Sequence, residues 1–212
     1  MSFSLRLGAL FLITLMAAGC ATAPVVDRQK SARLWNLHLE RLEQIGQWSF
    51  AGRVAVRSGS RAWSARLDWR QRHDRFEILI TAPMGQGAAR LDGVPGRVVL
   101  ELPGEAPLQA PSPEALLEAY TGMAVPLGGM RFWLVGRPDP AAPATLEWDE
   151  GGRLARLEQG GWEVRYRRYE AVEGVDLPGR VDLWNEKVRV RVVIDGWSLP
   201  VRTGKEDERQ AS

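Results

Sequence analysis

The spacing of apolar residues along the chain changes from a helical period to a strand period. Between residues 27 and 46, apolar side chains such as Leu34, Leu37 and Leu42 recur at steps of three and four, which predicts an amphipathic helix. From Trp48 onward, apolar and polar residues alternate one by one. This alternation predicts strands that each have one apolar and one polar face.

The alternation continues through most of the chain and is broken by turn residues. Ser58-Gly59-Ser60 separates the first two runs and predicts a hairpin. Ser112, followed by Pro113, predicts the start of a second helix that stops at Gly122, and residues 128–135 predict a third. Strands are expected at 48–57, 62–69, 76–81, 87–93, 96–102, 145–149, 153–159, 161–169, 179–185 and 187–195.

These elements predict a mainly β fold with helices. About ten strands with one apolar face each could form a single curved antiparallel sheet, whose concave face the helices would have to cover. We find no internal repeat, and residues 31–203 are predicted to form a single domain. The charged end, residues 204–212, is predicted to be disordered.

The amino-terminal residues 1–19 are typical of an export signal. Arg6 is their only charged residue, and an apolar run from Leu7 to Ala18 follows it, too short for a typical transmembrane helix. Cys20 comes directly after Ala17-Ala18-Gly19, and these four residues together resemble the lipobox of bacterial lipoproteins. In that class the cysteine thiol receives diacylglycerol, the preceding peptide is cleaved, and the new amino terminus is acylated. The alternative is a plain signal peptide with a chance cysteine.

The segment after the cysteine indicates how the chain is attached. Residues 20–30 are small, polar or proline-containing, which predicts a flexible lipidated tether. The residue after Cys20 is not aspartate, and by resemblance to enterobacterial lipoproteins this favours the outer membrane over the inner one. We therefore predict a lipid-anchored protein at the periplasmic face of the outer membrane.

Composition narrows the function further. The 212 residues include 28 basic and 26 acidic side chains, and a formal charge of +2 gives no electrostatic case for nucleic acid. A single cysteine excludes an intrachain disulfide and a cysteine-rich metal site, and two histidines leave little room for a histidine-based one. Nine tryptophans indicate large apolar contact surfaces.

Catalytic motifs are missing from the sequence. It contains no nucleophile elbow, phosphate-binding loop, zinc-protease motif or dinucleotide fingerprint. His38 is interpreted as a packed or solvent-facing side chain and not as a ligand. Glu147, Asp149 and Glu150 could in principle supply a glycosidase with two carboxylates, but they lie in a glycine-flanked turn and are interpreted as a solvated hairpin. We predict that the chain is not an enzyme.

The aromatic residues and one loop carry the strongest functional signal. Aromatic side chains on core-facing positions can fill a core or line a pocket for an apolar ligand, and the residue pattern leaves both open. Pro83 and Gly85 flank Met84 in a predicted turn, which would put an apolar residue at an exposed tip that could contact a bilayer. The candidate cavity-lining residues are Trp48, Phe50, Trp63, Leu67, Trp69, Ile78, Ile80, Trp133 and Trp162.

Several spaced motifs together resemble the LolB family of outer-membrane lipoproteins. They cover nearly all of the chain after Cys20. They are Trp35 with His38, Gly52-Arg53-Val54-Ala55-Val56, Trp69 with Gln71, Pro83-Met84-Gly85, Leu117 through Gly122 with Val125-Pro126-Leu127, Trp133 through Pro138, Gln159-Gly160-Gly161-Trp162 with Tyr166 and Tyr169, Leu177-Pro178, and Trp197.

The resemblance implies a half-open antiparallel β-barrel with an α-helical lid over an apolar cavity. It implies a receptor that accepts lipoproteins from the periplasmic carrier LolA, holds their acyl chains, and inserts them into the inner leaflet of the outer membrane without a nucleotide. The family carries an apolar residue, typically leucine, at a protruding loop tip, where this chain has Met84. A monomer is expected, with no cofactor beyond the lipid on Cys20.

Two other functions stay open at this stage. The chain could be a structural scaffold lipoprotein of an outer-membrane assembly complex, in which case a filled, tryptophan-packed core is expected. It could also be a cell-wall-acting hydrolase, in which case a cleft with two facing carboxylates is expected.

Overall fold

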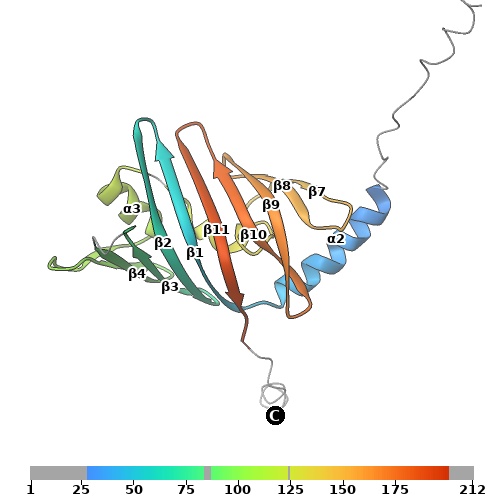
Figure 1. The fold of residues 1–212 in the computed structure, drawn as a ribbon, viewed down its shortest axis with the longest axis horizontal. Coiled ribbons are helices and arrows are strands. Elements are labelled where there is room, and N and C mark those ends of the chain that lie inside the picture. The colour runs from blue at the N-terminus through green and yellow to red at the C-terminus, as the bar shows by residue number, and fades with distance from the viewer. Residues whose placement is uncertain (1–27, 84–86, 124, 201–212) are drawn as a thin grey trace, which may run out of the picture.

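A computed structural model describes residues 28–83, 87–123 and 125–200, so the predicted export signal and the predicted disordered tail lie outside it. Figure 1 shows most of the strands side by side. The elements are α2 (Arg28–Glu43), β1 (Gln47–Ser58), β2 (Arg61–Arg72), β3 (Arg75–Thr81), β4 (Ala88–Val94), β5 (Arg97–Glu101), β6 (Leu108–Ala110), α3 (Pro113–Thr121), α4 (Leu127–Trp133), β7 (Ala144–Trp148), β8 (Leu154–Gln159), β9 (Trp162–Val172), β10 (Val175–Trp184) and β11 (Val188–Ser198).

The eleven described strands form one sheet in the order β6-β5-β4-β3-β2-β1-β11-β10-β9-β8-β7. Sequence neighbours pair as antiparallel strands, with the exception of β6 and β7, and at the centre the first strand also pairs antiparallel with the last. The edge strands of the described sheet, β6 and β7, do not pair with each other, so the sheet stays unclosed. This confirms the predicted mainly antiparallel β fold.

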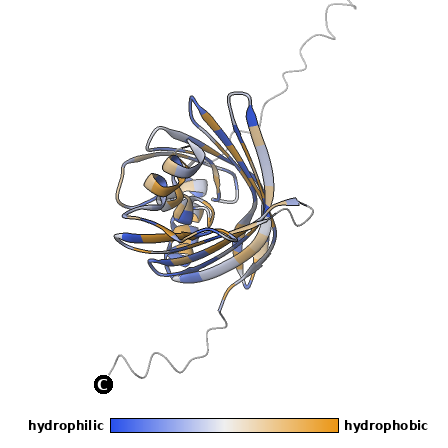
Figure 2. Ribbon diagram, turned by 90° about the vertical axis from the view of Figure 1, so that its left-hand side faces the viewer, coloured by the Kyte–Doolittle hydropathy of each residue, from blue (hydrophilic) through white to orange (hydrophobic). Residues whose placement is uncertain are grey.

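The predicted alternation of faces is visible in each long strand. In β1, Phe50, Val54 and Val56 are buried while Arg53 and Arg57 on the opposite face are exposed. Side chains of successive strand residues point to opposite faces, so the sheet has an apolar inner face and a charged outer face. Figure 2 shows the sheet curling around short helices on its inner side.

The short helix α3 has the ends that its sequence predicts. The Ser112 hydroxyl accepts a hydrogen bond from the Ala115 amide at 3.2 Å, which satisfies one of the free donors of the first turn. Gly122 follows the helix with φ of 71°, a left-handed conformation, and its amide donates to the Glu118 carbonyl at 2.8 Å. The amide of Gly128 donates to the Glu114 side chain at 2.7 Å, which joins α4 to α3.

Helix α2 packs against the other half of the sheet, at β7 and β10 (Figure 1). Trp35 stacks on Trp148 with ring centroids 6.3 Å apart. Gly152 permits this close approach, because a Cβ atom there would lie 2.5 Å from the Leu34 carbonyl carbon. His38 is buried in this contact, and burial lowers its pKa. Among the described residues, no helix has the length and apolar character needed to cross a bilayer.

The structure extends the predicted elements in two places. The short strand β6 lies in a polar, proline-containing segment in which no strand was predicted. Strands β9 and β10 run on to a turn at Glu173 and Gly174, both with positive φ, beyond the residues where alternation is clear. The predicted helix, from residue 27, and the predicted tether, residues 20–30, overlapped, and α2 begins at Arg28, so residues 28–30 belong to the helix. The β6 residues Leu108 and Gln109 are exposed and show no apolar alternation, whereas Leu177 and Pro178, which the structure adds to the start of β10, are buried.

Of the three carboxylates considered for hydrolysis, Glu147 lies in β7, and Asp149 and Glu150 lie at the turn between β7 and β8. Asp149 accepts hydrogen bonds from the amides of Gly151 and Arg153, both at 2.9 Å, and pairs with the Arg153 guanidinium at 2.7 Å. Glu147 pairs with Arg156 at 2.9 Å. The Asp149 side chain therefore organises a hairpin turn, which is the interpretation that the sequence favoured.

Candidate functional site

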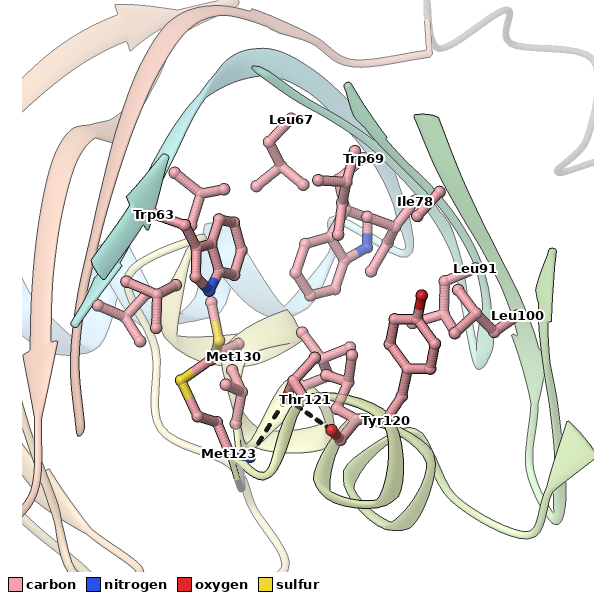
Figure 3. A pocket seen from close by; sticks show the side chains of 18 residues that line it. Trp63, Leu67, Trp69, Ile78, Leu91, Leu100, Tyr120, Thr121, Met123 and Met130 are labelled. Carbon is pink, nitrogen blue, oxygen red and sulfur yellow. Dashed lines mark hydrogen bonds between the residues drawn. The ribbon is translucent and has the colours of Figure 1, made fainter. Parts of the chain in front are cut away.

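An apolar cavity of 210 Å³ lies between the inner face of the sheet and the segment from α3 to α4 (Figure 3). Strands supply one wall and the helical segment supplies the other. The strand residues are Val54, Val56, Trp63, Leu67, Trp69, Ile78, Ile80, Ala89, Leu91, Leu100 and Val190. The helical segment contributes Leu117, Tyr120, Thr121, Met123, Val125, Leu127 and Met130.

The cavity lining presents almost no hydrogen-bonding capacity. Thr121 is a polar lining residue, and its hydroxyl donates to the Leu117 carbonyl at 2.6 Å and accepts from the Met123 amide at 3.2 Å (Figure 3). Both hydrogen bonds join the Thr121 hydroxyl to backbone groups at the end of α3, so the hydroxyl is already satisfied within the protein. No lining residue in the described part of the chain carries a charge at neutral pH. Such a lining suits an aliphatic ligand and would penalise a charged one.

Two aromatic side chains mark where the cavity meets solvent. Trp63 on β2 is 37% exposed and Tyr120 on α3 is 49% exposed, although both line the cavity. Inside, Met123 and Met130 project from the helical side (Figure 3). Methionine side chains are flexible and adapt to ligands of different shape. The cavity thus has a strand wall of branched and aromatic side chains and a more adaptable helical wall.

The structure brings five of the predicted lining residues together at this cavity. Their positions alternate on strands β2 and β3, so their side chains share the inner face of the sheet. These five are Trp63, Leu67, Trp69, Ile78 and Ile80. That they hold acyl chains stays a prediction.

Trp48 and Phe50 are not among the described residues that line the cavity. They pack instead in an aromatic cluster with Trp69 and Trp197, with ring centroids 5.2 Å apart for Phe50 and Trp197 and 5.6 Å for Trp48 and Trp69. Trp69 belongs both to this aromatic cluster and to the cavity lining. Its indole donates a hydrogen bond to the Gln71 side chain at 3.0 Å. Trp197 on β11 is the register partner of Phe50 on β1, so the cluster packs side by side along the sheet.

Trp133 and Trp162 also lie away from the cavity lining. The Trp133 indole donates to the side-chain oxygen of Gln159 at 2.7 Å, and its carbonyl accepts from the Tyr166 hydroxyl at 3.0 Å. Burial of that hydroxyl raises the pKa of Tyr166. Trp162 is buried at the start of β9, where it pairs in register with Gln159. The hydrogen bonds of Trp133 therefore hold the end of α4 against β8 and β9.

The helical wall was not among the predicted lining residues. Its residues belong to segments that were recognised as a helix and as a family motif, but their spacing did not show that the side chains point into the cavity. They include Leu117, Tyr120, Met123 and Met130. Of the predicted loop tip, Pro83 is exposed, and Met84 and Gly85 lie outside the described residues. The Ala82 amide donates to the Gly87 carbonyl at 2.9 Å, so the two flanks of this loop lie close together.

Comparison with known proteins identifies the family. The family model described as outer membrane lipoprotein LolB matches residues 46–197. The chain belongs to the LolB family. It is similar to the outer-membrane lipoprotein LolB of Nitrosococcus oceani, with 40% identity over 92% of this chain and 98% of that one. It is also similar to LolB of Halorhodospira halophila, with 41% identity over 92% and 96% of the two chains.

Solved structures support the fold at much lower identity. A LolA superfamily protein from Nitrosomonas europaea aligns with a TM-score of 0.51 and 12% identity, over 81% of this chain and 96% of that one. A DUF1329 family protein from Desulfovibrio piger aligns with a TM-score of 0.53 and 8% identity, over 82% and 93%. The LolB assignment confirms the predicted outer-membrane lipoprotein and agrees with the prediction that the chain is not an enzyme.

Proposed function

We propose that this LolB-family protein accepts lipoproteins from the periplasmic carrier LolA and passes them to the inner leaflet of the outer membrane. The observation that carries the proposal is the apolar cavity of 210 Å³ with an aromatic mouth. Each acyl CH₂ group gains about 0.8 kcal/mol on leaving water, so a receptor for acyl chains needs such a lining. The chain acts as a monomer in this proposal.

Transfer without a nucleotide must run downhill in affinity. The cavity would bind acyl chains more tightly than the carrier does and less tightly than a bilayer does. An engineered cavity of about 150 Å³ holds one benzene molecule, so a cavity of 210 Å³ must widen to take a full acyl chain. The segment α3–α4 serves as the lid that moves, because it forms one whole wall and offers two flexible methionines.

The test of this function is uptake of cargo in solution. The protein without its own lipid, mixed with a carrier that holds a radiolabelled lipoprotein, is expected to remove the label from the carrier. Co-migration of label and protein in size-exclusion chromatography measures the transfer and also gives the oligomeric state. If the label stays on the carrier at micromolar protein, the chain is not an acceptor, and a scaffold role takes its place.

Membrane attachment is proposed to depend on Cys20. Its thiol carries diacylglycerol and its amino group an acyl chain, with residues 1–19 removed, residues 20–30 as the tether, and residues 31–203 as the folded domain. Several buried acyl chains give stable anchoring, which a single chain does not. Cys20→Ala is expected to move most of the protein from the membrane fraction to the soluble periplasm or the inner membrane. Retention in the outer membrane, measured by density fractionation, would rule out lipidation as the anchor.

The loop tip Pro83-Met84-Gly85 is proposed to contact the bilayer during insertion of cargo. Met84→Glu is expected to leave uptake from the carrier unchanged and to lower insertion into liposomes by tenfold or more, because placing a carboxylate in the acyl region costs about 1–3 kcal/mol or more. The measurement is transfer of radiolabelled lipoprotein from the loaded protein to vesicles. Met84→Leu is the control and should insert cargo normally. Equal insertion by all three forms contradicts the role of the tip.

A further inference from the structure

A groove of 880 Å³ crosses the outer face of the sheet, on the side opposite the helices. It lies at the end of the sheet where β1 turns into β2 and β10 turns into β11. Its lining is mainly arginine, tryptophan and small residues. The lining residues are Ala55, Val56, Arg57, Ala62, Trp63, Ser64, Arg167, Asp182, Leu183, Trp184, Arg189, Val190 and Arg191.

The groove has an uncompensated positive charge. Arg57 and Arg189 lie directly opposite each other on β1 and β11, both exposed, and like charges in this position are destabilising. Neither guanidinium forms an ion pair with a described carboxylate. A pair of adjacent arginines without acidic partners is a feature of sites that bind an external anion.

The single carboxylate of the groove is already used. Asp182 pairs with Arg191 at 2.8 Å, Arg180 at 3.2 Å and Arg167 at 3.3 Å. Partial burial alone would raise the pKa of Asp182, but hydrogen bonds from Arg191 and Arg180 lower it below its usual value. Its negative charge therefore serves to hold the neighbouring arginines in place and leaves Arg57 and Arg189 free for a ligand.

Two tryptophans border the arginines. Trp184 lies on the groove, and the Arg165 guanidinium stacks over its ring at 5.2 Å. Trp63, Val56 and Val190 line both the groove and the apolar cavity, so the two lie on opposite faces of the same part of the sheet. Tryptophan beside arginine is the combination typical of surfaces that lie at the headgroup level of a bilayer.

The sheet register relates the groove to the predicted loop tip. Thr81 ends β3 opposite Arg66 on β2, and the chain then runs through Pro83 toward the same end of the sheet as the β1–β2 turn. Gly87 returns it to β4 from that end. The basic groove, the cavity mouth and the flanks of this loop therefore all lie at one end of the molecule.

We propose that this groove binds the phosphate groups of anionic phospholipid headgroups, so that the protein docks with this end of the sheet on the membrane surface. The inference rests on the proposed function, because it assigns the surface that faces the receiving bilayer. It also assigns a second contact between the protein and the bilayer, which is polar and separate from the apolar loop tip. Arg57 and Arg189 bind lipid phosphate, while Trp63 and Trp184 lie at the interface.

The test uses the full lipidated chain on vesicles and a single reporter. Because the chain has one cysteine, Cys20, an introduced thiol can be labelled alone once Cys20 is lipidated. Ser64→Cys puts a fluorophore in the groove, and Ser198→Cys puts one on an exposed residue at the opposite end of the sheet. Quenching by a phospholipid with a nitroxide headgroup is measured in phosphatidylcholine vesicles with and without phosphatidylglycerol.

The Ser64 reporter is expected to be quenched strongly when phosphatidylglycerol is present and to recover in high salt, while the Ser198 reporter stays unquenched. Arg57→Gln with Arg189→Gln should lower the docked-to-undocked ratio about 30-fold, since each basic side chain near an anionic surface contributes about a fivefold factor. Arg72→Gln with Arg75→Gln is the matched control, because these exposed arginines form a like-charged pair across β2 and β3 away from the groove.

Equal quenching at the two reporter sites overturns the proposal, and so does an equal effect of the two arginine pairs. If the groove variant docks normally but takes cargo from the carrier more slowly, the groove binds an acidic protein surface and the lipid assignment is wrong. Uptake of cargo is measured separately on the same preparations. An unmodified chain that docks through the groove but takes up no cargo would refute the proposed function and support the groove.

Discussion

Leu117→Glu is expected to abolish uptake of lipoprotein acyl chains while the protein stays folded. Leu117 lies on α3, half-buried, with its side chain on the helical wall of the cavity. In the unliganded protein the new carboxylate can still reach water through the half-exposed helix face. An acyl chain that fills the cavity would remove that water, and no charged group of the described lining could pair with the carboxylate.

The expected size of this effect follows from the cost of a buried charge. A penalty of about 3 kcal/mol would already weaken binding more than a hundredfold, and an unpaired carboxylate costs at least that much. The measurement is the fraction of radiolabelled lipoprotein that moves from the carrier to the variant. Ala119→Glu is the matched control, because it places the same carboxylate on an exposed position of the same helix.

Thermal unfolding of the two variants separates binding from stability. Both are expected to unfold within a few degrees of the unmodified protein, since neither position is fully buried. Normal uptake by Leu117→Glu would mean that acyl chains bind elsewhere. Loss of uptake in Ala119→Glu as well would mean that α3 docks on the carrier and does not cover the cargo.

The alternation of residues was sufficient to predict most of the strands and their apolar faces. Leu67, Trp69 and Ile78 line the cavity because strand phase alone decides that they point inward. Phase does not decide what covers an inward residue. Phe50 has the same phase as Val54, yet Phe50 packs against Trp197 from the far end of the chain while Val54 lines the cavity.

The parts that could not be predicted depend on contacts between distant segments. The pairing of β1 with β11 brings Arg57 next to Arg189, and no local pattern reveals that the two meet. The direction of Leu117 and Tyr120 depends on how α3 lies against β5 and β6, and β6 itself was missed because it is short and mostly exposed. Long-range packing therefore decides both the helical wall and the charge of the outer face.

Gln159→Leu is expected to lower the free energy of unfolding by about 3–5 kcal/mol, the largest stability loss that we predict for a single polar side chain. Gln159 is buried, and its oxygen accepts hydrogen bonds from the Trp133 indole at 2.7 Å and the Asp139 amide at 2.9 Å. Its amide nitrogen donates to the carbonyls of Asp139 at 2.8 Å and Ala142 at 2.7 Å. Leucine would leave these buried groups without partners, at about 1–3 kcal/mol each before relaxation.

Urea unfolding followed by tryptophan fluorescence measures this loss of free energy. Gln109→Leu is the control, because it makes the same chemical change on the exposed edge strand β6, where it should cost less than about 0.5 kcal/mol. A small effect at Gln159 would mean that water replaces its hydrogen bonds. Because Trp133 ends α4 and Met130 on the same helix lines the cavity, the loss at Gln159 should also loosen the helical wall. Hydrogen exchange of the α4 amides should then rise well before global unfolding, which would connect the buried glutamine to the lid movement that we propose for cargo entry.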